Sequence, residues 1–119
     1  NSAAQAKVGT LAAQFSDQTS SQIKENALKH KAVPGITTLY MKGHIMLYLG
    51  SVDGCAFAIH APWGYREACP GGENGRKCRP EVFHVINRVV VSDLSLGEGS
   101  WKKSLLERLL TIRVIEQGR

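Results

Sequence analysis

The chain has 119 residues and a mass of 13.0 kDa, which suits one compact domain or part of one. Its hydrophobic fraction of 43% excludes wholesale disorder, and its apolar runs are too short to span a bilayer. The formal net charge of +5 and the pI near 9.3 favour anionic partners, namely nucleic acid, acidic lipid or an acidic wall polymer, without choosing among them.

The first six residues, NSAAQA, contain neither a start methionine nor a signal-peptide pattern. We expect either that a targeting segment has been removed or that the chain begins inside a larger protein. The sequence contains no internal repeat and no linker long enough to separate two domains, so residues 1–119 are predicted to belong to a single domain.

The elements predicted first are helices. The segment 3–14 is rich in alanine and glutamine, which favours a short helix. A clearer helix is predicted over residues 20–31, where Thr19 or Ser20 can cap the amino end and three basic residues at 29–31 suit the carboxyl end. Pro34 and Gly35 end it.

Strands are then predicted over residues 36–41, 44–49, 56–60, 82–91 and 111–115 from β-branched composition and alternation. The 82–91 strand is long, and a bend is expected near Asn87 and Arg88. Between the last two strands, Ser104 and Glu107 have the spacing of a capping box, which predicts a short helix through about residue 110. The pattern as a whole predicts an α+β fold, with an antiparallel β-sheet meander and short flanking helices.

Two histidines lie in the predicted hairpin formed by residues 44–49 and 56–60. A three-residue loop at 51–53 would make Gly50 face Gly54 and His44 face His60 directly. A two-residue turn at positions 53–54 would instead place the apolar set of one strand on the polar face of the other, so the even pairing is preferred. Ala56 and Ala58 then leave room on the histidine face for another packed element.

Two adjacent imidazoles suit a base and an orienting residue, in which one ring takes a proton from a nucleophile and the other fixes its tautomer. A thiol is the natural nucleophile, because a thiolate and an imidazolium stabilise each other. The alternative is two partly buried histidines that are merely hydrogen-bonded. No third ligand is evident for a metal site, and we expect no metal or cofactor.

The chain also contains three cysteines, Cys55, Cys69 and Cys78, so at least one is unpaired within the monomer. Their spacing does not match a structural zinc site. The glycine-rich segment between Cys69 and Cys78 can bring these two thiols together at low entropic cost, and a disulfide there would indicate an oxidising compartment. Two reduced thiols remain an equal alternative.

Residues 42–50 (KGHIMLYLG) and 59–61 (IHA) resemble the core of NlpC-type peptidoglycan cysteine peptidases, the papain-like NlpC/p-sixty superfamily. Residues 63–66, 88–94 and 104–109 resemble parts of a branch of that family. The resemblance covers roughly residues 33–114. It implies a papain-like half-domain and a Cys-His-His hydrolase that cleaves amide bonds in cell-wall stem peptides, typically between D-glutamate and a diamino acid, in the periplasm or cell envelope or as a secreted enzyme.

By this resemblance, His44 matches the catalytic base and His60 matches the orienting residue. The family's nucleophile is a cysteine at a helix start before the base, whereas no cysteine precedes Cys55 here. We therefore expect the chain to be the C-terminal portion of a catalytic domain, inactive alone, with the thiol on an upstream segment of the same protein. The absent helix would leave apolar sheet surface exposed. Cys55 is expected to be a small buried residue rather than a substitute nucleophile.

Trp63, Tyr65 and Arg66 follow His60 closely and are candidates to line the substrate groove, with Arg66 pairing a stem-peptide carboxylate. The alternative is an aromatic cluster that closes one end of the sheet. A different class of function is a non-catalytic cell-wall-binding module on a degenerate peptidase fold. Nucleic-acid binding is not expected, because the positive charges are scattered and no RNA-reading aromatic motif is present.

Overall fold

The computed structural model describes residues 7–62, 64–67, 82–85 and 87–115, which form an α+β fold. Six antiparallel strands form one sheet in the order β1-β8-β2-β3-β4-β7, and β5 and β6 form a separate antiparallel ribbon. The bounds are β1 Thr10–Gln14, α2 Ser21–Lys31, β2 Thr37–Met41, β3 His44–Val52, β4 Cys55–His60, β5 Gly64–Glu67, β6 Val82–Val85, β7 Val90–Asp93, α3 Leu105–Arg108 and β8 Thr111–Val114. The predicted α+β class with an antiparallel sheet and short helices is confirmed.

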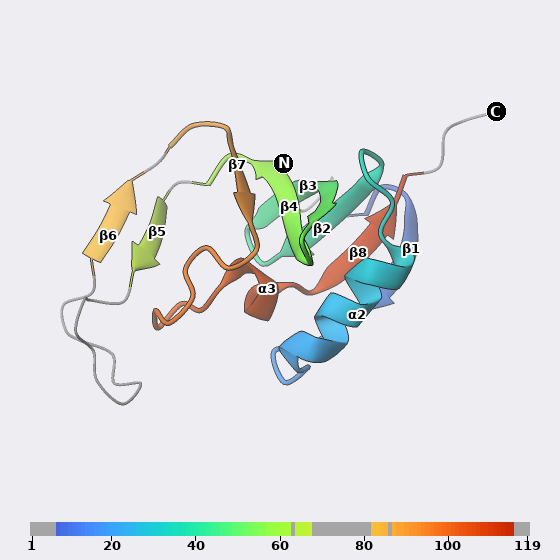
Figure 1. Cartoon of the computed structure of the whole chain (residues 1–119), viewed down its shortest axis with the longest axis horizontal. Coiled ribbons are helices and arrows are strands. Elements are labelled where there is room, and N and C mark those ends of the chain that lie inside the picture. Colours follow the sequence, from blue (N-terminus) through green and yellow to red (C-terminus); the bar gives the residue numbers. More distant parts are fainter. Residues whose placement is uncertain (1–6, 63, 68–81, 86, 116–119) are drawn as a thin grey trace.

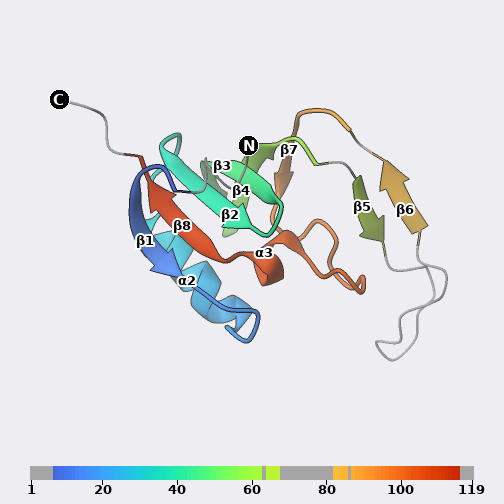
Figure 2. The same cartoon turned by 180° about the vertical axis from the view of Figure 1, so that it is seen from behind.

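The helices α2 and α3 lie on one face of the sheet (Figure 1). From behind, β1, β8 and β2 lie in front of α2, while the β5–β6 ribbon stands at the other end of the molecule (Figure 2). Strand β8, the last in the chain, lies between β1 and β2, so the prediction that the strands form a meander is wrong. In the described residues, no helix has both the length and the apolar character needed to cross a membrane.

The core lies between the helices and one face of the sheet. Alternate residues of β2 are buried, and Met46 and Tyr48 of β3 and Ala58 of β4 continue the same face. This period of two is what a strand with one covered face requires. The buried hydrophobic residues are Leu28, Leu39, Met41, Met46, Tyr48, Ala58, Leu94, Leu105, Leu109 and Ile112. His44 and His60 have the parity of this buried face, so both imidazoles arise on the core side of the sheet.

The predicted helix at 20–31 is confirmed as α2, with the Ser20 hydroxyl accepting a hydrogen bond from the backbone of Ile23. The predicted helix at 3–14 is wrong over its described part, because residues 10–14 form strand β1. This strand pairs with β8 through a ladder that contains one register shift. The ladder with β8 pairs the backbone N–H and C=O groups that a helix would have paired internally. This tertiary pairing outweighs the helix propensity of the alanine-rich segment.

The long strand predicted at 82–91 is two strands, β6 and β7, which belong to different sheets. Asn87 between them has a φ of +44°, which lies in the left-handed region and cannot continue an extended ladder. The interruption sends β6 to pair with β5, and it leaves β7 to pair with β4 at the edge of the main sheet.

The hairpin between β3 and β4 has a different register from the predicted one. Its turn is the two-residue Asp53–Gly54 turn, because Val52 pairs with Cys55, so the predicted three-residue loop is wrong. Both turn residues have positive φ, 51° and 79°, as in the type I′ turn that suits strand twist. A bulge between Tyr48 and Gly50 then inserts one extra residue into β3 and restores the apolar faces.

A buried lysine joins the two helices. Lys24 of α2 has none of its surface exposed, and its Nζ donates a hydrogen bond of 2.5 Å to the carbonyl oxygen of Glu107 in α3. Its ammonium group also lies 5.9 Å from the ring centroid of Phe15. Burial lowers the pKa of Lys24, an effect that the charge of Glu107 partly opposes. The bond fixes α3 against α2 and so sets the position of the residues that α3 carries.

The turn geometry predicts how much stability the protein loses when Gly54 is replaced. A Cβ at Gly54 meets nothing within 4 Å, so the Gly54→Ala change introduces only the strain of a φ of +79°. We expect it to lower the free energy of unfolding by about 1 kcal/mol, measured by urea denaturation. Gly54→Asn is the matched control and should cost less, because asparagine adopts the left-handed conformation more readily. Equal stability of the alanine variant and the wild type would contradict a type I′ turn.

Candidate functional site

His44 is held by the β2–β3 hairpin. It is the first residue of β3 and pairs with Met41, the last residue of β2, across a turn in which Gly43 has a φ of +77°. The side chain is partly buried on the core face. Because the turn and the ladder both fix the backbone at this position, the imidazole leaves the sheet in a defined direction.

His60 is the last residue of β4 and is only 5% exposed. The ladder pairs Tyr48 with Ala58 and Leu47 with Ile59, so His44 and His60 are offset along the strands rather than directly opposite as predicted. The predicted direct pairing is therefore wrong. The bulge keeps the two residues on one face, and a diagonal pair on one face remains within reach of imidazole side chains.

The two imidazoles are nevertheless neighbours. Nε2 of His44 lies 2.8 Å from Nδ1 of His60, and the ring centroids are 5.0 Å apart with the planes 68° from parallel. Nε2 of His60 in turn lies 2.7 Å from Oγ of Ser92 on β7. The three side chains form one chain of hydrogen bonds across three adjacent strands, β3, β4 and β7. We call this set, His44, His60 and Ser92, the histidine relay.

Of the four ring nitrogens in the two imidazoles, one has no hydrogen-bond partner among the described residues. Both nitrogens of His60 and Nε2 of His44 are occupied within the relay. Nδ1 of His44 has no hydrogen-bond partner in the described part of the chain and is not among its fully buried, unsatisfied atoms. If His44 acts as a base through that atom, its Nε2 carries the proton and donates to His60, and His60 then donates from Nε2 to Ser92.

Burial keeps the relay uncharged near neutral pH. Desolvation, and then the charge of His44, lower the pKa of His60 to about 4. The pKa of His44 is also lowered, first by desolvation and then by the positive charge of Arg108 on α3. His44 is therefore a neutral imidazole that is able to accept a proton.

Ser92 and Arg108 are the functional candidates that the sequence alone did not single out. Both lie in segments that carried the family resemblance, 88–94 and 104–109, yet neither had a predicted role. Ser92 could have been found only from the β4–β7 register, which pairs it with Ala58 and so puts it beside His60. Arg108 is placed by the predicted capping box, which is present, with Ser104 and Glu107 bonded reciprocally.

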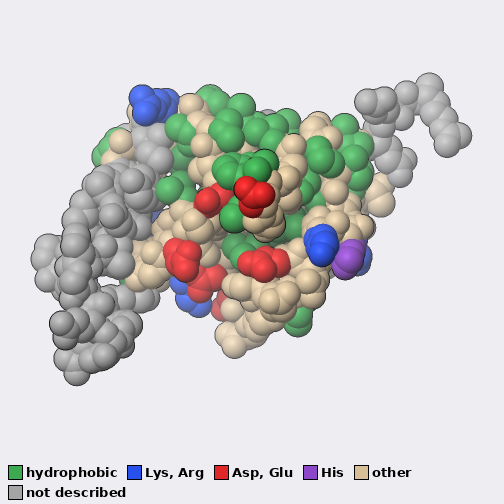
Figure 3. Space-filling model, viewed as in Figure 1, with side chains coloured by type: hydrophobic (Ala, Val, Ile, Leu, Met, Phe, Trp, Pro, Cys, Tyr) green, Lys and Arg blue, Asp and Glu red, His purple; other side chains and the backbone are tan. Residues whose placement is uncertain are grey.

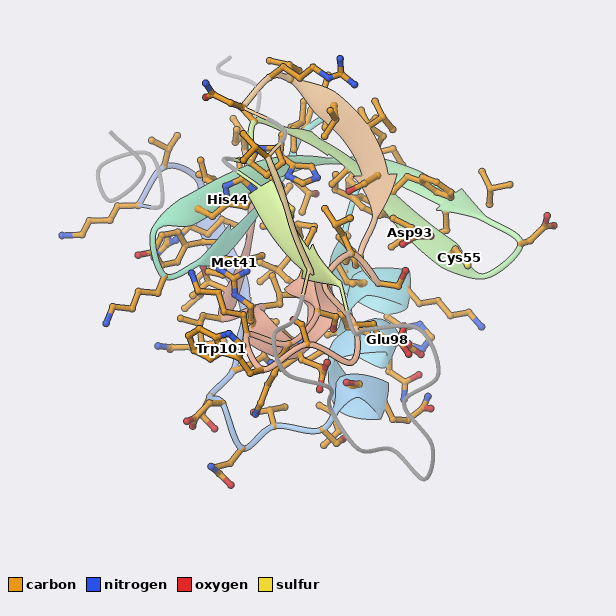
Figure 4. The ribbon with its side chains drawn as sticks, turned by 90° about the vertical axis from the view of Figure 1, so that its left-hand side faces the viewer. Met41, His44, Cys55, Asp93, Glu98 and Trp101 are labelled. Carbon is orange, nitrogen blue, oxygen red and sulfur yellow. The ribbon has the colours of Figure 1, made fainter. Side chains whose placement is uncertain are left out.

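Cys55 lies at the other end of β4 from His60. The two are five residue steps apart along the strand, about 17 Å, and Figure 4 places Cys55 on the other side of the molecule from His44. The prediction that Cys55 is buried is wrong, because its side chain is exposed beside the tight turn. Its position nevertheless agrees with the prediction that it does not replace the nucleophile.

Several predicted site residues are not placed. Trp63, Cys69 and Cys78 lie outside the described residues, so the groove contact and the disulfide stay predictions. The backbone of Tyr65 and Arg66 belongs to β5, but their side chains are outside the described set. In the part of the chain that the structure describes, no three metal-binding side chains come together.

A hollow of about 1080 Å³ lies between α2 and the turn end of β3, β4 and β7. Leu28, Ala56 and Leu94 contribute apolar surface to it, whereas Ala58 is fully buried. The room predicted on the alanine face is therefore present beside Ala56. Carboxylates gather on this face (Figure 3), and Glu25, Asp93 and Glu98 are among the lining residues of the hollow.

The burial of His60 predicts a pH dependence of stability. Its pKa is about 4 in the folded chain and about 6.5 when unfolded, so the unfolded state binds more protons between these values. The stability is full above pH 6.5 and decreases as the pH falls toward 4, by up to about 3 kcal/mol. Urea denaturation across this range should show the slope. His60→Gln should flatten it, while His30→Gln, at an exposed histidine, should leave it unchanged.

The relay predicts the tautomers of both rings. Imidazole ¹⁵N NMR at neutral pH should show His44 and His60 protonated at Nε2. Ser92→Ala removes the acceptor for His60 Nε2–H, and because an unsatisfied buried N–H is costly, His60 should move toward the Nδ1–H form. Ser92→Thr keeps a hydroxyl and should retain the wild-type tautomers. Identical spectra for the wild type and the alanine variant would show that Ser92 does not set the tautomers.

The chain matches no protein-family model and none of the curated proteins with which it was compared.

Proposed function

We propose that this chain provides the base and the orienting histidine of a cysteine peptidase of the Cys-His-His type, acting on peptidoglycan stem peptides. The observation that supports the proposal most directly is the 2.8 Å contact between His44 Nε2 and His60 Nδ1, which leaves His44 Nδ1 open. In this proposal the sheet with its two helices is a papain-like half-domain of the NlpC type, and the protein works in the periplasm or cell envelope, or is secreted.

The nucleophile is a thiol supplied by a preceding segment of the same protein. It approaches Nδ1 of His44, because that is the nitrogen left free in the relay. His44 takes the thiol proton, and the thiolate attacks the carbonyl carbon of the stem-peptide amide. The imidazolium then gives its proton to the leaving amine, which leaves a thioester. Water, deprotonated by His44, hydrolyses the thioester to the carboxylic acid and restores the thiol.

His60 and Ser92 position His44 and do not react. While His44 gains its second proton at Nδ1, its Nε2–H continues to donate to His60, so no hydrogen bond of the relay has to break. The lowered pKa values hold both rings neutral before the thiol arrives. The net charge of +5 suits attraction to an anionic wall polymer.

The test compares this chain with the longer protein that contains the upstream cysteine. The 119-residue chain is expected to leave stem peptides intact. The longer protein should release the amine product, and His44→Ala in it should lower kcat/KM by roughly a thousandfold or more. His30→Ala removes an exposed histidine at the end of α2 and is the matched control, with unchanged activity expected. Product release is measured by chromatography of a defined stem peptide.

Two outcomes oppose the proposal. Turnover by the 119-residue chain alone would mean that the nucleophile is assigned wrongly. Retention on purified peptidoglycan that is insensitive to His44→Ala, with no cleavage by the longer protein, would support the non-catalytic wall-binding module instead.

A further inference from the structure

Arg108 lies at the end of α3 where the chain returns to the sheet. Two residues later, the backbone N–H of Leu110 donates to the carbonyl of Tyr40 at 2.8 Å. Tyr40 precedes Met41, the residue that pairs with His44. These backbone contacts bring the carboxyl end of α3 to the end of β3 at which His44 lies, and Figure 4 shows His44 and Met41 together there, away from Asp93 and Cys55.

The guanidinium of Arg108 has no counterion among the described residues. Its side chain is partly buried, and burial lowers its pKa from the usual value, although an arginine stays protonated at neutral pH. No described carboxylate forms an ion pair with it, and its backbone N–H is used separately, in a bond to Ser104. A cation that is partly removed from water and left unpaired is unfavourable unless an anion arrives to pair with it.

The positive charge of Arg108 also acts on His44. In the described residues the groups that bear on the proton affinity of His44 are Arg108 from α3 and His60 from β4. Of these, only Arg108 carries a permanent charge. An anion bound at Arg108 would offset that charge at the position where His44 must accept a proton.

We propose that the guanidinium of Arg108 is a subsite for a carboxylate of the substrate, next to His44. The proposal rests on the proposed function, and it narrows the substrate class to stem peptides that have a free carboxylate near the scissile amide. The nearest such group is the α-carboxylate of the D-glutamyl residue, whose γ-carbonyl would be attacked. The planar fork of the guanidinium can bind it through two parallel N–H···O bonds, and a carboxamide at that position cannot form the same pair.

Binding at this subsite couples recognition to catalysis. The carboxylate neutralises the charge that disfavours protonated His44, so the pKa of His44 rises when the substrate is in place. His44 then becomes a better acceptor for the thiol proton only in the presence of a substrate with the free acid. An amidated peptide occupies the site without this effect.

The experiment uses the 119-residue chain and a pair of peptides. The first is L-alanyl-γ-D-glutamyl-L-lysine with its glutamyl α-carboxylate free, and the second carries a carboxamide at that position. NMR titration measures the affinity of each peptide and the pKa of His44. We expect the free acid to bind about tenfold more tightly than the amide and to raise the pKa of His44, whereas the amide leaves this pKa unchanged.

Variants at two arginines locate the effect. Arg108→Gln should remove the preference for the acid and the change in the His44 pKa, and Arg108→Lys should keep part of the preference, because the charge remains while the fork is lost. Arg88→Gln removes the same charge at an exposed arginine and should change neither quantity. Amide spectra of each variant check that the fold is retained. If the glutamine variant is unfolded, the lysine variant carries the comparison.

The results for the subsite are independent of peptide cleavage. Equal affinity of the wild-type chain for acid and amide, or no binding of the acid at millimolar concentration, overturns the subsite. Equal weakening of both peptides by Arg108→Gln overturns it too, because the residue would then be structural. An acid preference that depends on Arg108, together with no cleavage by the longer protein, would keep the subsite and overturn the proposed peptidase activity.

Discussion

The structure depends on keeping the same face of β3 and β4 turned toward the core. A two-residue turn puts these strands one residue out of phase, which would direct either the apolar residues or the histidines to solvent. The extra residue at the β3 bulge corrects the phase partway along the hairpin. Beyond the bulge, Met46, Tyr48 and Ala58 are buried together, and the imidazoles of His44 and His60 lie on the same face.

The location of the imidazoles on a buried face explains their chemistry. A histidine pair on the solvated face would keep ordinary proton affinity and would have water as its main partner. Here the surrounding core removes water, so each ring nitrogen needs a specific partner, and three of the four have one within the relay. The same packing that stabilises the sheet therefore pairs three of the ring nitrogens and leaves the fourth, Nδ1 of His44, without a hydrogen-bond partner among the described residues.

Local signals in the sequence predicted much of this architecture. The helix cap at Thr19 or Ser20, the capping box from Ser104 to Glu107 and the alternation in β3 and β4 act within a few residues. The structure has each of them, with Ser20 as the cap. The predictions that are wrong concern residues whose structure depends on pairing with distant parts of the chain. Residues 10–14 pair with β8, a strand about a hundred residues away, and the helix or strand propensity of these residues does not contain that information.

The alternation of residues along the two strands predicts that His44 and His60 are neighbours on one face, and the bulge keeps them on one face. Their offset was missed, since a bulge leaves little mark in a sequence, and Ser92 was missed because its role depends on which strand adjoins β4.

Strand β7 is the outermost strand of the main sheet and pairs only with β4 among the described strands. Val89 and Val91 on or beside it are more than half exposed, so little packing holds its outer side. Edge strands of this kind fray more readily than central ones, and slow amide exchange is typically lost there first. Because Ser92 is on β7, fraying removes the partner of His60 and admits water to its ring. Each transient separation of β7 from β4 would therefore expose the His60 ring to protons from solution.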